Sequence, residues 1–323
     1  MTRAWLMLAA SWALSATLSA QDKCGPDEQV PWWPMGEHSF GGTTAAQRAA
    51  MRPALTSAQA LVRKTVYGTP RGYAMYPVFG YGGEVVDATR LHEYLFGIIP
   101  YWACNKYEEN GSYFTIYFNP DPMKWSESDR PLPDERGDGL YTQRIKSAPL
   151  FGSTATFGHF QEENTEGLYV LFTSGGESPT LDVTQEEYLR ALIFTFEGKN
   201  QEKLKEAIAA TRQMYANDSL GRDKTLAGLT ALGDRMRAQI AAMTPAERAA
   251  PAWVGGTDIV PAGTIGAKAA VRRNPAFYRA RTSPFEVRAI LVHIPGAMPV
   301  LRAYHEQAYK EFDWEGLKKL LAP

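Results

Sequence analysis

The segment 112–118 constrains the fold most, because its side chains alternate in character along its whole length. Phe114, Ile116 and Phe118 form one face of this segment, and Tyr113, Thr115 and Tyr117 form the other. Such alternation is typical of a strand that buries one face. The preceding pair Asn110–Gly111 suits a type I′ turn, so we predict a β-hairpin with residues 98–107 as the partner strand.

The predicted strands precede most of the predicted helices. A second hairpin is expected between 154–161 and 168–173, after a long polar loop at 119–139. Thr44 and Thr184 open capping boxes, each followed by apolar residues at helical spacing. We expect Pro53 to end or kink the first of these helices.

Two more helices are predicted at 201–215 and 219–243, and a strand at 285–294. The apolar residues of 219–243 lie near heptad spacing, which favours packing inside the molecule but leaves a dimer seam as an alternative.

The order of these elements predicts an α+β fold, in which an antiparallel, hairpin-built sheet is covered by an N-terminal helix and a central helical segment. Four regions are expected along the chain, the last of them packed with the rest as one domain. They are a signal peptide at 1–20, a β-rich region with an N-terminal arm and helix at 21–183, a helical segment at 184–250 and a mixed C-terminal segment at 251–323.

The first twenty residues have the pattern of a cleaved secretory signal peptide. Arg3 gives a positive start, residues 4–14 are apolar, and mostly small residues follow at 15–20 before the expected cleavage site, where Leu18 is an imperfect match. The apolar run is too short to cross a bilayer as a helix. We therefore expect the protein in the periplasm or outside the cell.

The only two cysteines, Cys24 and Cys104, follow the signal and form an even pair in an exported chain. This predicts one disulfide, which would tie the Pro-rich arm to the first sheet. Closing a loop of about 80 residues would stabilise the fold by about 4 kcal/mol at most. Two free buried thiols, or a lipid on Cys24, are the alternatives.

Composition excludes several classes of protein. The chain is 45% hydrophobic and 21% charged, as in ordinary globular proteins. A net charge of −1 argues against nucleic acid as a partner, because phosphate binding requires an excess of Lys and Arg. After the signal we find no uninterrupted run of eighteen apolar residues, so we expect no membrane span.

Reaction motifs are lacking in the sequence. The five histidines are scattered without the spacing of a metal site, and Ser174 precedes glycines without the pattern of a nucleophile elbow. The basic cluster that holds Arg272 and Arg273 is best explained as a solvated face. We expect no cofactor and no metal. Carboxylates that the fold could bring together are Glu108, Glu109, Glu162, Glu163 and Glu166.

Aromatic residues provide the candidate ligand-binding site. Tyr113 and Tyr117 lie on the face opposite the predicted core, with Trp102 and Trp125 nearby in sequence. Flat rings with polar edges can stack on sugars or contact a peptide. The alternative is that this face is buried by the arm that carries Trp32 and Trp33.

The sequence thus predicts an exported, non-catalytic protein that binds a glycan or a cell-envelope protein. A secreted, glycan-acting hydrolase is the second hypothesis. A deep pocket with perturbed ionisable groups would favour the hydrolase, and a shallow aromatic face would favour the binding protein.

Overall fold

The structure is a computed structural model that describes residues 29–39, 42–82, 89–102, 113–127, 131–137, 139–144, 146–158, 167–197, 202–256, 258–296 and 299–323. The signal segment, Cys24, Cys104 and the turn at Asn110–Gly111 lie outside these ranges, so the disulfide remains a prediction.

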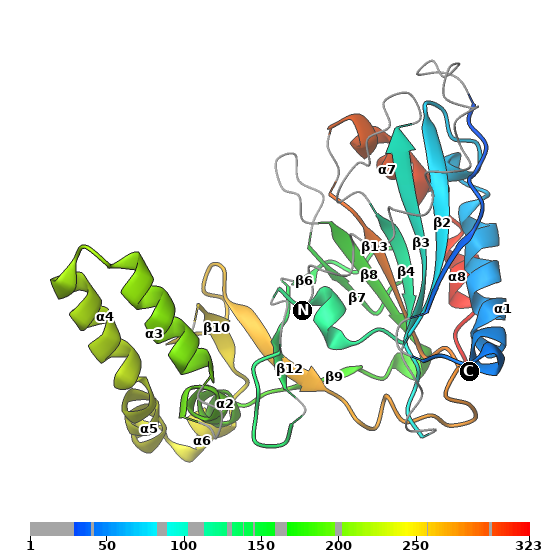
Figure 1. The fold of residues 1–323 in the computed structure, drawn as a ribbon. Helices are drawn as coiled ribbons and strands as arrows, with labels where there is room; N and C mark the ends of the chain where they lie inside the picture. Colours follow the sequence, from blue (N-terminus) through cyan, green and yellow to red (C-terminus); the bar gives the residue numbers. More distant parts are fainter. Residues whose placement is uncertain are drawn as a thin grey trace.

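The fold is α+β, as expected, and the described residues form two sheets (Figure 1). Within these ranges the large sheet has eight strands, all antiparallel to their neighbours except the first pair. In spatial order they are β1 (Gly36–Ser39), β2 (Tyr73–Tyr81), β3 (Tyr94–Trp102), β4 (Phe114–Phe118), β13 (Ala289–Ile294), β8 (Leu168–Thr173), β7 (Ala155–Phe157) and β6 (Lys146–Ser147).

The central strand of the large sheet comes from near the end of the chain. β13 lies between β4 and β8 and pairs with both, with Ile290 opposite Phe118 and Phe172. Five of its six residues are buried, because both faces of the sheet are covered here. An uninterrupted apolar run such as Ala289–Val292 suits a strand without a solvated face.

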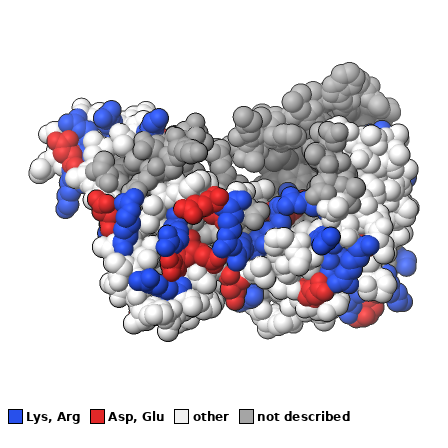
Figure 2. Space-filling model, turned by 90° about the horizontal axis from the view of Figure 1, so that it is seen from below, with Lys and Arg blue, Asp and Glu red and all other residues white. Residues whose placement is uncertain are grey.

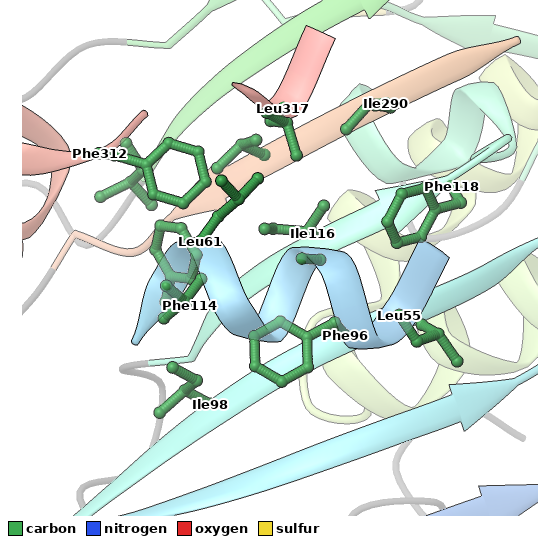
Figure 3. Packing of buried hydrophobic residues seen from close by; sticks show 14 of the residues in the cluster. Leu55, Leu61, Phe96, Ile98, Phe114, Ile116, Phe118, Ile290, Phe312 and Leu317 are labelled. Atoms are coloured by element: carbon green, nitrogen blue, oxygen red, sulfur yellow. The ribbon is translucent and has the colours of Figure 1, made fainter. Parts of the chain in front are cut away.

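Three helices cover one face of the large sheet (Figure 1). These are α1 (Ala45–Val62), α7 (Pro299–Glu311) and α8 (Trp314–Lys318). Leu55 and Leu61 of α1 and Leu317 of α8 pack on the strand residues that alternate inward (Figure 3). The inward residues include Phe96, Ile98, Phe114, Ile116, Phe118 and Ile290. The alternation predicted for 112–118 is therefore confirmed.

The central helical segment covers the second sheet. That sheet holds β11 (Asp258–Ile259), β10 (Trp253–Gly255), β12 (Lys268–Arg273) and β5 (Leu140–Thr142), and β9 (Thr180–Asp182) also pairs with β12. The helices are α2 (Gln185–Glu197), α3 (Glu202–Met214), α4 (Ser219–Thr230), α5 (Leu232–Ala242) and α6 (Pro245–Ala249). We call these elements the second lobe; they lie to the left in Figure 1.

Helix starts were predicted well and helix interiors less well. The capping boxes at Thr44 and Thr184 form, with Gln47 and Glu187 as the reciprocal partners. Pro53 does not end α1, because Met51 and Leu55 on either side of it are fully buried and hold both turns in the core.

The single helix predicted over 219–243 is two helices, separated at Ala231. Leu232 and Met236 of α5 are buried against α2 and the second sheet, which confirms intramolecular packing for this half.

Asn119 ends β4 in a left-handed conformation (φ 49°) and is 2% exposed. Its amide Nδ2 donates to the carbonyls of His92 (3.2 Å) and Glu286 (2.8 Å). Its Oδ1 accepts from the backbone N–H groups of Arg288 (2.8 Å) and Ala289 (3.2 Å). One side chain thus joins three segments of the chain next to β13.

We expect Asn119→Ala to lower the free energy of unfolding by roughly 2–4 kcal/mol, because it leaves buried backbone groups without partners. Urea denaturation followed by tryptophan fluorescence measures the loss. The matched control is Asn217→Ala, on the exposed turn between α3 and α4, which should change stability by less than about 0.5 kcal/mol. Equal stability of the two variants would contradict this role.

His305 predicts a loss of stability in acid. Its ring is 0% exposed, Nδ1 contacts the hydroxyl of Tyr67, and burial lowers the pKa to about 4. The unfolded chain takes up this proton at about pH 6.5, so the free energy of unfolding should fall between about pH 6.5 and 4, by on the order of 3 kcal/mol.

The measurement is urea denaturation across this pH range for the wild type, His305→Gln and Tyr67→Phe. His305→Gln should remove about half of the pH dependence, because burial also lowers the pKa of His293 to about 4 and that histidine still contributes. Tyr67→Phe keeps the buried imidazole and should retain all of it. An unchanged pH dependence in His305→Gln would contradict the assignment.

Candidate functional site

The second face of the large sheet, which points away from α1, carries half-buried aromatic rings. Strand register places Tyr76 of β2 opposite Ile99 of β3, and Ala74 opposite Tyr101. Trp33 of the N-terminal arm stacks on Tyr101, with ring centroids 4.8 Å apart and planes 25° apart, and meets Tyr76 edge-on at 6.2 Å. We call Trp33, Tyr76 and Tyr101 the aromatic patch.

Partly exposed apolar side chains surround this patch. Val78, Leu95 and Ile99 lie on the same face, and each is half-buried. Gly97, at the centre, has no side chain, and the neighbouring Thr115 is 6% exposed. The result is a mostly apolar floor beside the rings of the aromatic patch.

Further along the strands, the same face is covered by a second apolar cluster. Trp125, Phe277 and Tyr278 pack there on Leu171 and Leu291 of the sheet. This cover ends near Tyr117, which packs against it while remaining half-buried. The second face is therefore covered at one end and partly open at the other.

The structure separates the four aromatic residues that we predicted as ligand-binding. Tyr113 and Tyr117 lie on the second face and are half-buried. Trp102 ends β3 opposite Tyr73, and its side chain lies outside the described residues. Trp125 is 0% exposed and stacks on Phe157 (6.2 Å), so its expected place on the surface is corrected to the core.

The rings of the aromatic patch were not among the predicted site residues. Trp33 appeared in the sequence only as part of the arm expected to cover this face, and in part it does so by stacking on Tyr101. Trp32 instead packs on the other face, where its indole N–H donates to the carbonyl of Tyr67 (2.7 Å) and Arg63 lies over its ring. The arm therefore divides between the two faces.

A cavity of about 90 Å³ lies where β3 begins and where β4 and β12 end. Its lining combines four charged side chains with an amide and three apolar or aromatic groups. The residues are Arg90, Leu91, Glu93, Asn119, Asp121, Arg273, Pro275 and Tyr278.

Two ion pairs fix the carboxylates of this cavity. Lys124 Nζ lies 3.4 Å from Glu93 Oε1, and Arg273 pairs with Asp121. Glu93 Oε2 also accepts from the backbone N–H of Asp121 (3.1 Å), so the two acidic residues are neighbours. Burial raises the pKa of Glu93 above its usual range, although Lys124 and Arg273 act in the opposite direction.

Sequence reasoning could not find this cavity. Glu93 was not among the carboxylates predicted to form a site, and Arg273 appeared only within a basic cluster that we expected to be solvated. Arg281 of the same cluster follows the expectation, since it is exposed and pairs with Glu177 (2.6 Å). Arg272 does not, because its side chain is only 19% exposed and pairs with Glu187 (2.9 Å). Figure 2 shows Lys and Arg interspersed with Asp and Glu on the face seen from below.

Among the residues that the structure describes, the other sequence candidates form no site. Gly175 has φ 62° in the 3₁₀ turn Ser174–Gly176, so the glycines after Ser174 serve the turn. Within the described ranges, no three His, Cys, Asp or Glu side chains form a group that could hold a metal ion. The carboxylates that we had considered for hydrolysis, at 108–109 and 162–166, fall outside these ranges.

Compared with family models, curated proteins and solved structures, the chain matches none of them. Among the residues that the structure describes, no helix combines the length and the apolar character that crossing a bilayer requires.

We expect Lys124→Met to raise the pKa of Glu93 further, because the ammonium group stabilises the ionised carboxylate. Carbon-detected NMR titration of the Glu93 carboxyl measures the shift. Lys268→Met is the matched control, since Lys268 pairs with Glu127 instead. A pKa for Glu93 that stays the same or falls in Lys124→Met would contradict the role of this ion pair.

Proposed function

We propose that this chain is an exported, non-catalytic protein that binds a glycan or a cell-envelope protein through the second face of its large sheet. The observation that carries the proposal is the aromatic patch of Trp33, Tyr76 and Tyr101, half-buried beside a mostly apolar floor. The compartment rests on the sequence of residues 1–20.

The chemistry of the patch suits a ligand that has both flat apolar and polar groups. Tyrosine and tryptophan offer large rigid surfaces and a polar edge, and therefore occur often at binding interfaces. Because the three rings contact one another, their positions are fixed before a ligand arrives, which lowers the entropic cost of binding. Tyr113, half-buried, directly precedes the start of β4.

The second hypothesis, a glycan-acting hydrolase, is favoured by one observation. Glu93 and Asp121 line one cavity together, and the pKa of Glu93 is raised, as a general acid requires. Against it, the cavity of about 90 Å³ is far smaller than the roughly 300–1,000 Å³ of ordinary ligand pockets. Both carboxylates are also held by cations. Binding is therefore the better-supported function.

The test is a binding screen of the purified protein against glycans and envelope proteins. Tyr76→Ala and Tyr101→Ala should each weaken the binding that the screen finds by at least about tenfold, because each removes a ring from the patch. Tyr215→Ala, which alters a half-buried ring on the turn after α3, should bind like the wild type. Melting temperatures of all variants show whether each is folded.

Undiminished binding in folded Tyr76→Ala and Tyr101→Ala would overturn the proposed site. Cleavage of a glycan in the screen, lost in Glu93→Gln, would establish the hydrolase instead. Tyr117→Ala does not test binding in this way. Tyr117 packs on the cluster around Phe277, so its loss should lower the melting temperature.

A further inference from the structure

The charged cavity is a separate site from the aromatic patch, at the opposite end of the strands. Glu93 directly precedes β3, whereas Tyr101 lies near the end of the same strand. The proposed binding of a glycan or an envelope protein at the aromatic patch does not use this cavity, so what the cavity binds is a further question.

The uncharged polar groups of the lining are already engaged. The amide of Asn119 makes four hydrogen bonds to backbone groups. The hydroxyl of Tyr278 donates to the carbonyl of Pro120 (2.6 Å). Among the polar side chains of the lining, the charged ones are therefore those that would bind a ligand.

Those charged side chains carry both signs. Arg90 and Arg273 lie close enough for Arg90 to lower the pKa of Arg273, and Glu93 and Asp121 are their anionic neighbours. A small dianion would be repelled by the two carboxylates, and a small cation by the two guanidinium groups. A ligand that matches this lining carries one positive and one negative group.

The existing ion pairs leave room for further bonds. A carboxylate has about four lone-pair sites, and Glu93 uses one oxygen towards Lys124 and the other towards a backbone N–H. A guanidinium has five donors, and Arg273 Nε is buried without an acceptor among the described residues. Arg273, Asp121 and Glu93 side chains are 31%, 17% and 30% exposed, so they remain within reach of solvent.

Size limits the ligand to a small molecule. One water needs roughly 10–15 Å³ on this scale, so about 90 Å³ holds several waters or one small organic molecule. The walls at Leu91, Pro275 and the ring of Tyr278 are apolar, which suits a short aliphatic group.

We propose that this cavity binds a small zwitterionic α-amino acid such as glycine or alanine. The carboxylate of the ligand lies against the guanidinium groups of Arg273 and Arg90, and its ammonium group lies against the carboxylate of Glu93. A methyl group contacts Leu91 and Tyr278, and a bulky side chain does not fit.

Isothermal titration calorimetry with the full chain tests the proposal, with glycine, alanine and phenylalanine as ligands. Acetate and methylamine, which carry one charge each, serve as single-sign probes. Glycine or alanine should bind saturably, and the other three ligands at least about tenfold more weakly. Glu93→Gln, Arg273→Gln and Arg90→Gln should each weaken alanine binding by about the same factor.

Arg272→Gln is the matched control, because Arg272 is adjacent on β12 but pairs with Glu187 outside the cavity, and it should bind alanine like the wild type. Arg90 is exposed at the rim of the cavity, so Arg90→Gln is expected to fold even if the substitutions at Glu93 or Arg273 disturb the fold. The proposal is overturned if glycine and alanine give no saturable binding to the folded wild type. It is equally overturned if acetate binds as well as alanine, or if folded Arg90→Gln and Glu93→Gln bind like the wild type. None of these outcomes bears on the aromatic patch.

Discussion

The hydrogen-bonded junction around Asn119 and Arg288 holds the central strand in place, and the rest of the fold depends on it. Asn119 binds the backbone at the start of β13. The side chain of Arg288, 1% exposed, donates to the carbonyl of Phe277 (2.6 Å), pairs with Glu177 and lies over the Phe277 ring. Buried polar groups of this kind stabilise only when nearly all are paired, so the junction tolerates one arrangement of these segments. It thereby sets the position of β13 between β4 and β8.

The same junction connects the two sheets. The segment 274–288 leaves β12 of the second sheet, passes beside Asn119 and enters the large sheet as β13. Backbone bonds from Leu91 to Tyr278 (2.8 Å) and from His92 to Pro284 (2.7 Å) tie this segment to the start of β3. The charged cavity is lined on one side by residues 90–93 and 119–121 and on the other by residues 273–278. Its acidic and basic residues therefore come from distant parts of the sequence.

Local sequence patterns predicted where strands and helices begin, whereas long-range packing determined which of their side chains are buried and which lie together in a cavity. Alternation at 112–118 and the capping boxes at Thr44 and Thr184 depend on neighbours a few residues away, and all three formed as expected. Pro53 does not end α1, which was one of the two outcomes expected, because burial of the flanking residues outweighs the lost hydrogen bond. Trp125 lies in the predicted polar loop and was assigned to the candidate ligand-binding site, but it ends a short 3₁₀ turn at Pro122–Trp125 and is buried in the core. The cavity joins residues about 180 positions apart, which no spacing in the sequence reports.

The late position of β13 has a consequence for the order of folding. A nascent chain that ends before Ala289 has β4 and β8 but lacks the strand that hydrogen-bonds to both. The edges of β4 and β8 that pair with β13 then lack hydrogen-bond partners, and the apolar side chains on these two strands stay exposed. Completion of the large sheet therefore waits until residues 289–294 have been made.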